Sequence, residues 1–272
     1  MTALRYRPLL PYAAAVGVVL IVAACAPLLS PHDPYAQDLE RALLAPSVEH
    51  LLGTDRYGRD LLSRVLVGAQ TTLGSALALL LFVSCAGSLI GAVSGYRGGR
   101  LDAGFMRLAD LLLAFPQLVF AIAIAGAFGG GLFYAAAALA FLGWAKYARI
   151  ARGLTLSLCA LPYMEAARMA GGSSCAVLRH HVLPNIAGPI LVTAALDLGT
   201  LTMELAGLSF LGLGAMPPTA EWGSMMSSGR SMLQTTPWVI LAPGAALTLT
   251  VAVFNLFGDK LRDVLAPKEV SK

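Results

Sequence analysis

The sequence predicts an all-helical integral membrane protein with six transmembrane helices. Of its 272 residues, 57% are hydrophobic and 12% are charged, and the mean hydropathy is +0.73, far outside the range of soluble domains. A transmembrane helix needs about 20 apolar residues, and suitable stretches recur with almost no charge. They cover residues 8–31, 65–96, 111–145, 182–220 and 231–258. Because 111–145 holds three successive glycines near its middle, we interpret it as two spans.

The limits of the spans follow from these stretches, and the charges between them set the orientation. We expect spans at residues 9–29, 70–96, 104–127, 132–151, 186–213 and 237–258. With both termini in the cytoplasm, 14 of the 19 lysine and arginine residues lie on the cytoplasmic side. Cytoplasmic loops are rich in these residues, so we predict that both termini are cytoplasmic. The net charge of +4 then reflects topology and is no argument for nucleic-acid binding.

The predicted spans divide the chain into four parts. Residues 1–29 form a cytoplasmic N-terminus and the first span, and residues 30–69 form an extracytoplasmic segment. Residues 70–258 form a five-helix transmembrane core with a cytoplasmic loop at 162–189, and residues 259–272 form a cytoplasmic tail.

The extracytoplasmic segment contains a predicted amphipathic helix. Asp55 with Arg59 and Asp60 with Arg64 stand four residues apart, an order that supports a helix by about 0.3 kcal/mol per pair. The leucines and valine that follow make one apolar face, so we expect this helix to lie on the outer membrane surface. The acidic residues lack the twelve-residue spacing of a calcium-binding loop.

The cysteines predict no disulfide and no metal site. Cys25, Cys85, Cys159 and Cys175 contain no CxxC pair and are divided between spans and cytoplasm. Residues 22–25, after a basic start and an apolar run, resemble a lipoprotein cleavage box. Cleavage there would remove the first span, but small residues beside a cysteine are ordinary inside a span, and we expect an uncleaved anchor.

The second and third spans carry signals for packing. Gly87, Gly91 and Gly95 recur every four residues and give the helix a flat groove for close helix contact. The helix in that groove could belong to this chain or to another subunit. In the third span, Pro116 predicts a kink.

Further charges lie near the cytoplasmic ends of the third and fourth spans. Asp110 follows Arg107 by three residues, and we expect the two to pair. Lys146, Arg149 and Arg152 form a basic stripe that we expect to anchor the fourth span at the lipid headgroups.

The fifth span holds the two most deeply placed charges, Asp197 and Glu204. They are seven residues, or two helical turns, apart and therefore share one face with Thr193 and Thr200. An ionisable group at this depth is costly unless it faces the bundle interior or water. These four residues are therefore candidates for a translocation pathway, and a hydrogen-bonded lock between helices is the alternative.

The polar loop at 162–189 predicts a helix, a break and a second helix. Pro162 can start the first helix, and Glu165 lies in its first turn, where a negative charge is favourable. Alanines at 166, 167 and 170 make a smooth face that a partner's backbone could approach closely.

The second half of this loop contains breaking and capping signals. Gly171 and the glycine after it break the first helix, a serine at 173 or 174 can cap the next one, and we expect Pro184 to stop it. A short exposed helix with a smooth face is suited to docking, and a mere connecting loop is the alternative.

The chain lacks the motifs of an enzyme. It contains no GxxxxGK[ST], no HExxH and no GxSxG sequence. Transport against a gradient would therefore use either an ion gradient through Asp197 and Glu204 or ATP hydrolysis by a partner, and the docking loop favours the partner.

Several motifs together resemble a known family. Glu165-Ala166-Ala167, then Gly171 and Leu183-Pro184-Asn185, resemble the EAA loop of bacterial ATP-binding-cassette importer permeases. Further similar motifs are Gly53-Thr54-Asp55, Gly58-Arg59-Asp60, Ala114-Phe115-Pro116, Leu208-Ser209-Phe210-Leu211-Gly212, Trp222-Gly223 and Leu261-Arg262-Asp263. These are similar to the C-type permeases of dipeptide, oligopeptide and nickel importers, and they cover nearly the whole chain.

This resemblance implies the type I importer permease fold in a bacterial inner membrane and a set of partners. The partners are a B-type permease, two ATP-binding subunits or domains and an extracytoplasmic substrate-binding protein, with ATP and magnesium held by the ATP-binding subunits and no cofactor held by this chain. The loop would couple ATP hydrolysis to transport through Tyr163, Glu165, Ala166, Ala167, Arg168, Ala170, Gly171, Leu183 and Pro184.

The resemblance also implies what is carried. Di- and oligopeptides are the first expectation, and nickel chelates or other small peptide-like or metal-bearing ligands are the second. A proton-coupled carrier is the competing class.

Overall fold

The computed structural model describes residues 7–171 and 173–265, which fold into helices joined by loops. The only β-type pairing in this part of the chain is an isolated bridge between Thr54 and Asp60, so the all-helical class is confirmed. The helices are α2 (Leu10–Ala24), α3 (Ala26–Leu29), α4 (Leu61–Arg97), α5 (Gly99–Leu113), α6 (Gln117–Ala127), α7 (Leu132–Cys159), α8 (Pro162–Met169), α9 (Ser174–Val177), α10 (Leu183–Phe210), α11 (Trp222–Gly229) and α12 (Trp238–Leu265), with 3-10 turns at Arg7–Leu9, Leu39–Arg41 and Arg230–Met232 and a π-helical stretch at Leu178–Val182.

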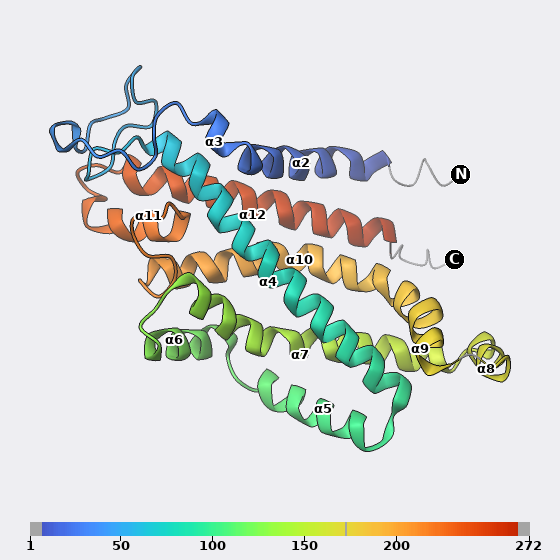
Figure 1. The fold of residues 1–272 in the computed structure, drawn as a ribbon. Coiled ribbons are helices and arrows are strands. Elements are labelled where there is room, and N and C mark those ends of the chain that lie inside the picture. The colour runs from blue at the N-terminus through green and yellow to red at the C-terminus, as the bar shows by residue number, and fades with distance from the viewer. Residues whose placement is uncertain (1–6, 172, 266–272) are drawn as a thin grey trace.

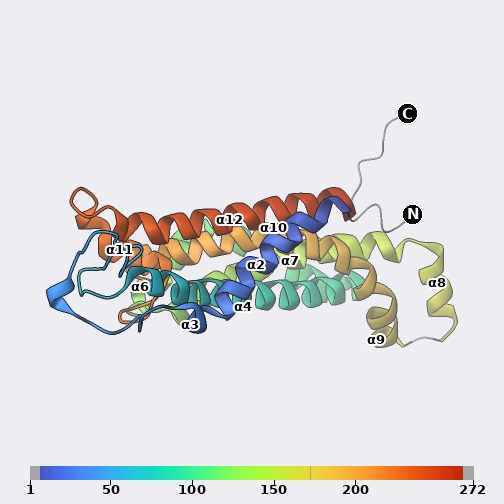
Figure 2. The same ribbon diagram turned by 90° about the horizontal axis from the view of Figure 1, so that it is seen from above.

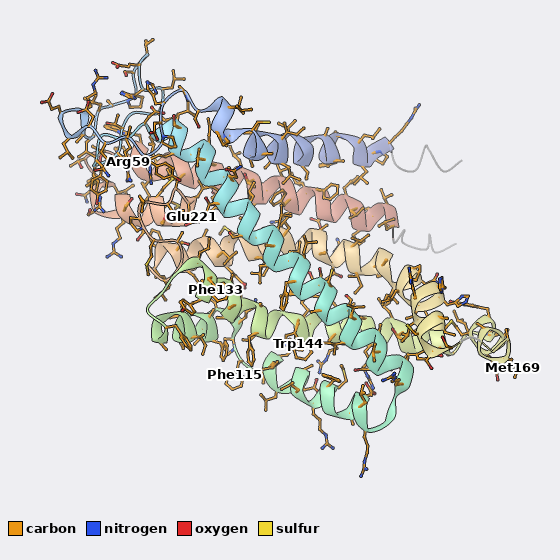
Figure 3. All side chains as sticks on the ribbon, viewed as in Figure 1. Arg59, Phe115, Phe133, Trp144, Met169 and Glu221 are labelled. Carbon is orange, nitrogen blue, oxygen red and sulfur yellow. The ribbon has the colours of Figure 1, made fainter. Side chains whose placement is uncertain are left out.

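The helices form an elongated bundle whose two ends differ. Figures 1 and 2 show the loops of residues 30–60 and α11 at one end, and α8 and α9 at the other. α2 begins and α12 ends on the side of α8 (Figure 1). In Figure 3, Arg59 and Glu221 lie at the loop-rich end and Met169 at the opposite end.

Four helical stretches among the described residues are long and apolar enough to cross a membrane. They are Arg7–Ala24, Leu61–Arg97, Ser174–Phe210 and Trp238–Leu265. α5 and α6 pass the same test together as one span that is bent by 85°, which makes up to five spans. The remaining predicted span corresponds to α7, which has 28 residues but is not among these stretches. Three basic residues in its second half lower its hydropathy.

The predicted breaks in the third and fourth spans are confirmed. α5 and α6 meet at an angle of 85°, and Pro116 stands directly before α6. Gly129, Gly130 and Gly131 separate α6 from α7, and their φ angles of +82°, +80° and +116° are ones that other residues rarely adopt.

The glycine groove of α4 packs inside the chain, against α7. A Cβ atom on Gly87 would collide with the carbonyl oxygen of Trp144, and one on Gly91 with that of Ala148. A Cβ atom on Gly95 would lie 3.0 Å from the carbonyl oxygen of Arg152. Of the two alternatives that the sequence leaves open, internal packing is therefore the correct one.

The expected amphipathic helix on the outer surface is wrong. Residues 54–60 form turns, and α4 begins only at Leu61. Gly58 has a φ angle of +71°, which interrupts a right-handed helix, and Asp60 caps α4 by accepting a hydrogen bond from the backbone of Ser63. The apolar residues that suggested a separate surface helix are therefore the first turns of α4.

The ion pairs of this segment are only partly as expected. Arg59 Nε donates to Asp55 Oδ2 over 2.7 Å, so the first pair exists, although in a turn. Arg64 does not pair with Asp60. Its Nε lies 3.5 Å from Asp55 Oδ2, because the turn folds Asp55 back over the start of α4.

The loop at 162–189 is helical on both sides of a break, as predicted, but Pro184 does not stop the second helix. α8 starts at Pro162, Gly171 has a φ angle of +80°, and Ser173 caps α9 by accepting a hydrogen bond from the backbone of Ala176. Helical structure then continues through Pro184 into α10. The π-helical stretch before Pro184 accommodates the missing N–H, and the side chain of Asn185 donates to the carbonyl of His181.

Candidate functional site

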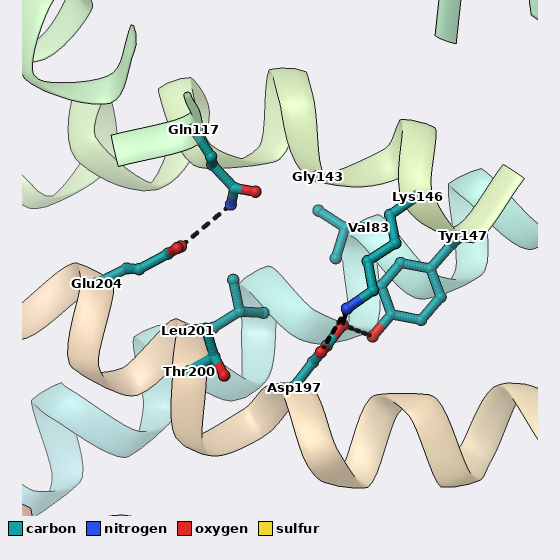
Figure 4. A pocket seen from close by; sticks show the side chains of 9 residues that line it. All are labelled: Val83, Gln117, Gly143, Lys146, Tyr147, Asp197, Thr200, Leu201 and Glu204. Atoms are coloured by element: carbon teal, nitrogen blue, oxygen red, sulfur yellow. Dashed lines mark hydrogen bonds and ion pairs between the residues drawn. The ribbon is translucent and has the colours of Figure 1, made fainter. Parts of the chain in front are cut away.

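Polar side chains from three helices surround a hollow of about 60 Å³ within the bundle (Figure 4). The bent pair α5 and α6 contributes the start of α6, α7 contributes the middle of its length, and α10 contributes one face, while α4 supplies an apolar wall. The lining residues are Val83, Gln117, Gly143, Lys146, Tyr147, Asp197, Thr200, Leu201 and Glu204.

Asp197 is held by two residues of α7. Lys146 Nζ lies 2.7 Å from Asp197 Oδ1 and 2.8 Å from Oδ2, and the hydroxyl of Tyr147 donates to Oδ2 over 2.9 Å. The side chain of Lys146 is 48% exposed and that of Asp197 is 17% exposed. The carboxylate is therefore paired, and about half of the lysine side chain stays exposed on the surface of the isolated chain.

Glu204 is held by the start of α6. Gln117 Nε2 donates to Glu204 Oε2 over 3.1 Å, and Gln117 is the first residue after Pro116. The proline bend therefore turns the chain so that a side-chain amide reaches the carboxylate of α10. Among the described residues, the carboxylates of Asp197 and Glu204 have separate partners and make no hydrogen bond to each other.

Three of the four pathway candidates lie together at the hollow. Asp197, Thr200 and Glu204 line it, in agreement with their two-turn spacing. Thr193 does not line it, and its hydroxyl donates to the carbonyl of Pro189 in the same helix.

The basic stripe of α7 forms ion pairs with aspartates of other helices, and its expected role as a headgroup anchor stays a prediction. Lys146 pairs with Asp197, Arg149 pairs with Asp110, and Arg152 binds both carboxylate oxygens of Asp102 over 2.6 Å. Arg149, from another helix, takes the place expected for Arg107. The stripe thus ties α7 to α5 on one side and to α10 on the other.

A second hollow lies between α8 and the helical turns that follow it. Its volume is about 590 Å³, and Tyr163, Ala166, Ala167, Ala170, Ala176, Val177, His180 and His181 line it. Figures 1 and 2 show α8 projecting beyond the end of the bundle. The fully buried side chain of Met164 attaches α8 to the bundle, while Tyr163 is 42% exposed.

The other loop candidates lie around this hollow without lining it. Glu165 is exposed, and no described side chain pairs with it. Gly171 forms the turn after α8, and Leu183 and Pro184 stand at the start of α10. The side chain of Arg168 lies outside the described part of the structure.

At the opposite end of the molecule, Glu221 is buried and accepts several hydrogen bonds, which the sequence does not predict. Its two carboxylate oxygens accept hydrogen bonds from the backbones of Gly223 and Ser224, at 2.9 and 2.8 Å, and from the hydroxyl of Thr72 at 3.3 Å. Burial raises the pKa of Glu221 in spite of these donors. The next residue, Trp222, is buried as well, and its Nε1 donates to the carbonyl of Val65 over 2.9 Å.

A family model described as "Binding-protein-dependent transport system inner membrane component" matches residues 87–270 of this chain. The chain belongs to this family. The permease is also 43% identical, over 255 aligned residues, to the probable D,D-dipeptide transport system permease protein DdpC of Escherichia coli (strain K12). The alignment covers 94% of this chain and 86% of that protein.

Two further relatives are named for the transport of nickel and of dipeptides. The nickel transport system permease protein NikC of Escherichia coli (strain K12) is 39% identical, over 94% of this chain and 93% of that protein. The dipeptide transport system permease protein DppC of Alkalihalophilus pseudofirmus is 38% identical, over 94% of this chain and 86% of that protein.

Family membership decides several alternatives. The chain is a multi-pass permease of the inner membrane and a non-catalytic subunit of an ATP-binding-cassette importer, a system that also includes an ATPase and a binding protein. The ATP-driven class is therefore correct, and the proton-coupled carrier is not supported.

Proposed function

We propose that this permease is one half of the translocation pathway of a di- or oligopeptide importer, and that it couples to the ATPase through residues 162–189. Relatives named as dipeptide permeases support the substrate class, at 43% and 38% identity. The polar wall made by Lys146, Asp197 and Glu204 supports a pathway for a charged or polar ligand.

A six-span topology with cytoplasmic termini is part of this proposal, with α7 as the additional span. Its 28 residues extend about 42 Å, more than the roughly 30 Å of the hydrocarbon core. Its three basic residues are paired with aspartates of α5 and α10, which lowers the cost of placing them near the membrane. Residues 30–60 are then extracytoplasmic and α8 is cytoplasmic.

The pathway assignment rests on the open face of α10. Thr200 is exposed, and Lys146 is half-exposed in the isolated chain, although both belong to membrane helices. Polar groups at this depth require water or a protein partner. A B-type permease that covers this face would complete a pathway lined from both sides.

The position and the exposed alanine face of α8 are the main support for coupling to the ATPase. The helix stands outside the bundle, is attached through Met164, and exposes a hollow walled by alanines. Such a wall lets the backbone of a partner approach closely. Two ATP-binding subunits or domains, which hold ATP and magnesium, would bind one such loop from each permease.

The decisive experiment is gentle purification through a tag on this chain, followed by mass spectrometry of the proteins that accompany it. We expect a B-type permease, an ATPase and, with substrate present, a binding protein. Recovery of the chain without any ATPase from cells that express the whole system would contradict the proposal.

A nickel chelate is the second candidate substrate, because the nickel permease NikC matches over 93% of its own length. ATP hydrolysis and uptake, measured on the complex reconstituted in vesicles with its binding protein, distinguish the peptide from the nickel chelate. Dipeptides should stimulate ATP hydrolysis and enter the vesicles, whereas stimulation by nickel chelates alone would select the second candidate.

A further inference from the structure

Three potential metal ligands meet at the loop-rich end of the molecule, far from the hollow between the spans. His32 follows α3, His50 lies in the long loop, and Asp60 caps α4. One ligand atom from each residue lies within 4.8 Å of the other two. The ligands are 18 and 10 residues apart in the sequence and form no recognisable spacing, so the sequence predicts no metal site here.

The carboxylate of Asp60 is oriented by its neighbours so that one oxygen faces the histidines. Oδ2 accepts hydrogen bonds from the backbone N–H and the hydroxyl of Ser63, at 2.8 and 2.7 Å. Oδ1 lies 2.9 Å from His50 Nδ1 and 3.8 Å from His32 Nδ1. The hydroxyl oxygen of Ser63 also accepts from the backbone N–H of His32 at 3.1 Å. Outer hydrogen bonds that fix ligating groups in this way are typical of metal sites.

His50 is buried and has one ring nitrogen without a hydrogen-bond partner among the described residues. The residue is 6% exposed, and its Nε2 is buried without a hydrogen-bond partner in the described part of the chain. Buried polar atoms of native proteins are nearly always partnered. Nδ1, the other ring nitrogen, is the atom that faces Asp60 Oδ1 and is therefore the ligand atom at this cluster, whereas Nε2 lies on the far side of the ring.

The cluster can be reached from outside. The side chain of His32 is 40% exposed. It lines an open hollow of about 490 Å³ together with residues of the same turn, including Pro31 and Asp33. An ion can therefore approach past His32 without unfolding of the loop.

We propose that His32, His50 and Asp60 bind one divalent transition-metal ion of the class that imidazole prefers, such as Zn²⁺. Two imidazoles and one carboxylate, with water as a further ligand, form a common donor set for these ions, whereas Ca²⁺ and Mg²⁺ take oxygen ligands. Ligand atoms about 2.0 Å from a tetrahedral ion are about 3.3 Å apart, and the present separations of 2.9 and 3.8 Å lie on either side of that value.

Such an ion would fasten two points of the extracytoplasmic segment to the start of α4. Its role is therefore to hold this segment in place, and it does not depend on which substrate the permease carries. Because the ligands come from three separate stretches, binding also stabilises the folded chain against unfolding.

The test uses the full chain, purified through a tag without histidines and freed of metal with a chelator. Titration calorimetry with Zn²⁺ and the absorption spectrum of added Co²⁺ are measured on the wild type and on H32N, H50N and D60N. H180N is the matched control, since His180 is an exposed histidine at the opposite end. We expect one saturable site per chain, a raised melting temperature with Zn²⁺, and at least a tenfold loss of affinity in the three ligand variants but not in H180N.

H32N keeps the test meaningful if the other variants unfold. Asp60 also caps α4 and His50 is buried, whereas the exposed ring of His32 makes no structural hydrogen bond in the described residues. The absence of saturable binding, or equal binding by the wild type and H32N, would overturn the proposal and leave the cluster as a structural hydrogen bond.

Discussion

Lys146 and Asp197 form an ion pair that joins α7 to α10 across 51 residues of sequence, with Nζ 2.7 Å from Oδ1. Tyr147 binds the same carboxylate from the neighbouring position of α7. The pair stands at the wall of the hollow, with the side chain of Lys146 half-exposed in the isolated chain. It is therefore placed to hold the two helices together and, in the proposed pathway, to meet a substrate.

We predict that Asp197→Asn slows transport. The substitution removes the charge that two donors share and leaves the ammonium of Lys146 without its counter-ion. Transport by reconstituted complex should fall roughly fivefold, which corresponds to about 1 kcal/mol for a half-exposed, charge-assisted contact. Adding Lys146→Met to Asp197→Asn should recover part of the loss, since no unpaired charge then remains.

Thr193→Val is the control for this prediction, because Thr193 lies on α10 but its hydroxyl bonds only to its own helix. It should transport at the wild-type rate. Wild-type transport by Asp197→Asn as well would mean that the pair only packs the helices.

The partners of the α7 cations show why the sequence predicts this site incompletely. Hydropathy and the two-turn spacing of Asp197 and Glu204 are local properties, and they locate the helix and its polar face. The pairing of Lys146 with Asp197, or of Arg152 with Asp102, depends on how helices about 50 residues apart in sequence pack. A basic stripe near a span end is also typical of headgroup anchors, so the sequence alone does not indicate these ion pairs.

We predict that Gly91→Ala destabilises the bundle strongly. The added methyl group would overlap the carbonyl of Ala148 in α7, and a backbone atom cannot move aside as a flexible side chain can. Overpacking of this kind costs about 1–3 kcal/mol. The melting temperature of the purified chain in detergent should therefore fall by several degrees.

Gly74→Ala is the matched control on the same helix. Nothing lies within 4 Å of a Cβ atom at Gly74, and alanine is the better helix former. The melting temperature should stay the same or rise slightly. Equal melting temperatures for Gly91→Ala and Gly74→Ala would show that α4 and α7 pack less closely than described.

The groove and the buried corner at Glu221 differ in how far the sequence predicts them. Glycines at every fourth position predict close contact with another helix, but they do not predict which helix makes this contact. Glu221 follows a run of turn residues, and nothing local distinguishes it from an exposed loop glutamate. Its burial arises because α11 folds against Thr72 of α4, about 150 residues earlier.

We predict that Glu221→Ala lowers stability by about 1–3 kcal/mol, because it removes the cap of α11 and leaves buried donors of Gly223 and Ser224 without an acceptor. Thermal unfolding of the purified chain measures the effect. Glu49→Ala is the control: Glu49 pairs with Arg41 at an exposed position, where ion pairs contribute little. An unchanged melting temperature for Glu221→Ala would contradict the capping role.

We predict that Glu165→Ala weakens the coupling between this permease and its ATPase. Glu165 lies in the first turn of α8, exposed beside the alanine-walled hollow, and no described side chain pairs with it. A charge kept exposed on a helix that projects from the bundle is available to a partner. We expect less ATPase to be recovered with the tagged chain, or normal ATP hydrolysis with several-fold less transport.

Glu40→Ala is the control, because it removes an exposed glutamate at the opposite end of the molecule and should leave ATPase recovery unchanged. If Glu165→Ala matches Glu40→Ala in both recovery and transport, the coupling role of α8 must rest on its alanine face alone, and substitution of Ala166 by leucine would then test that face directly.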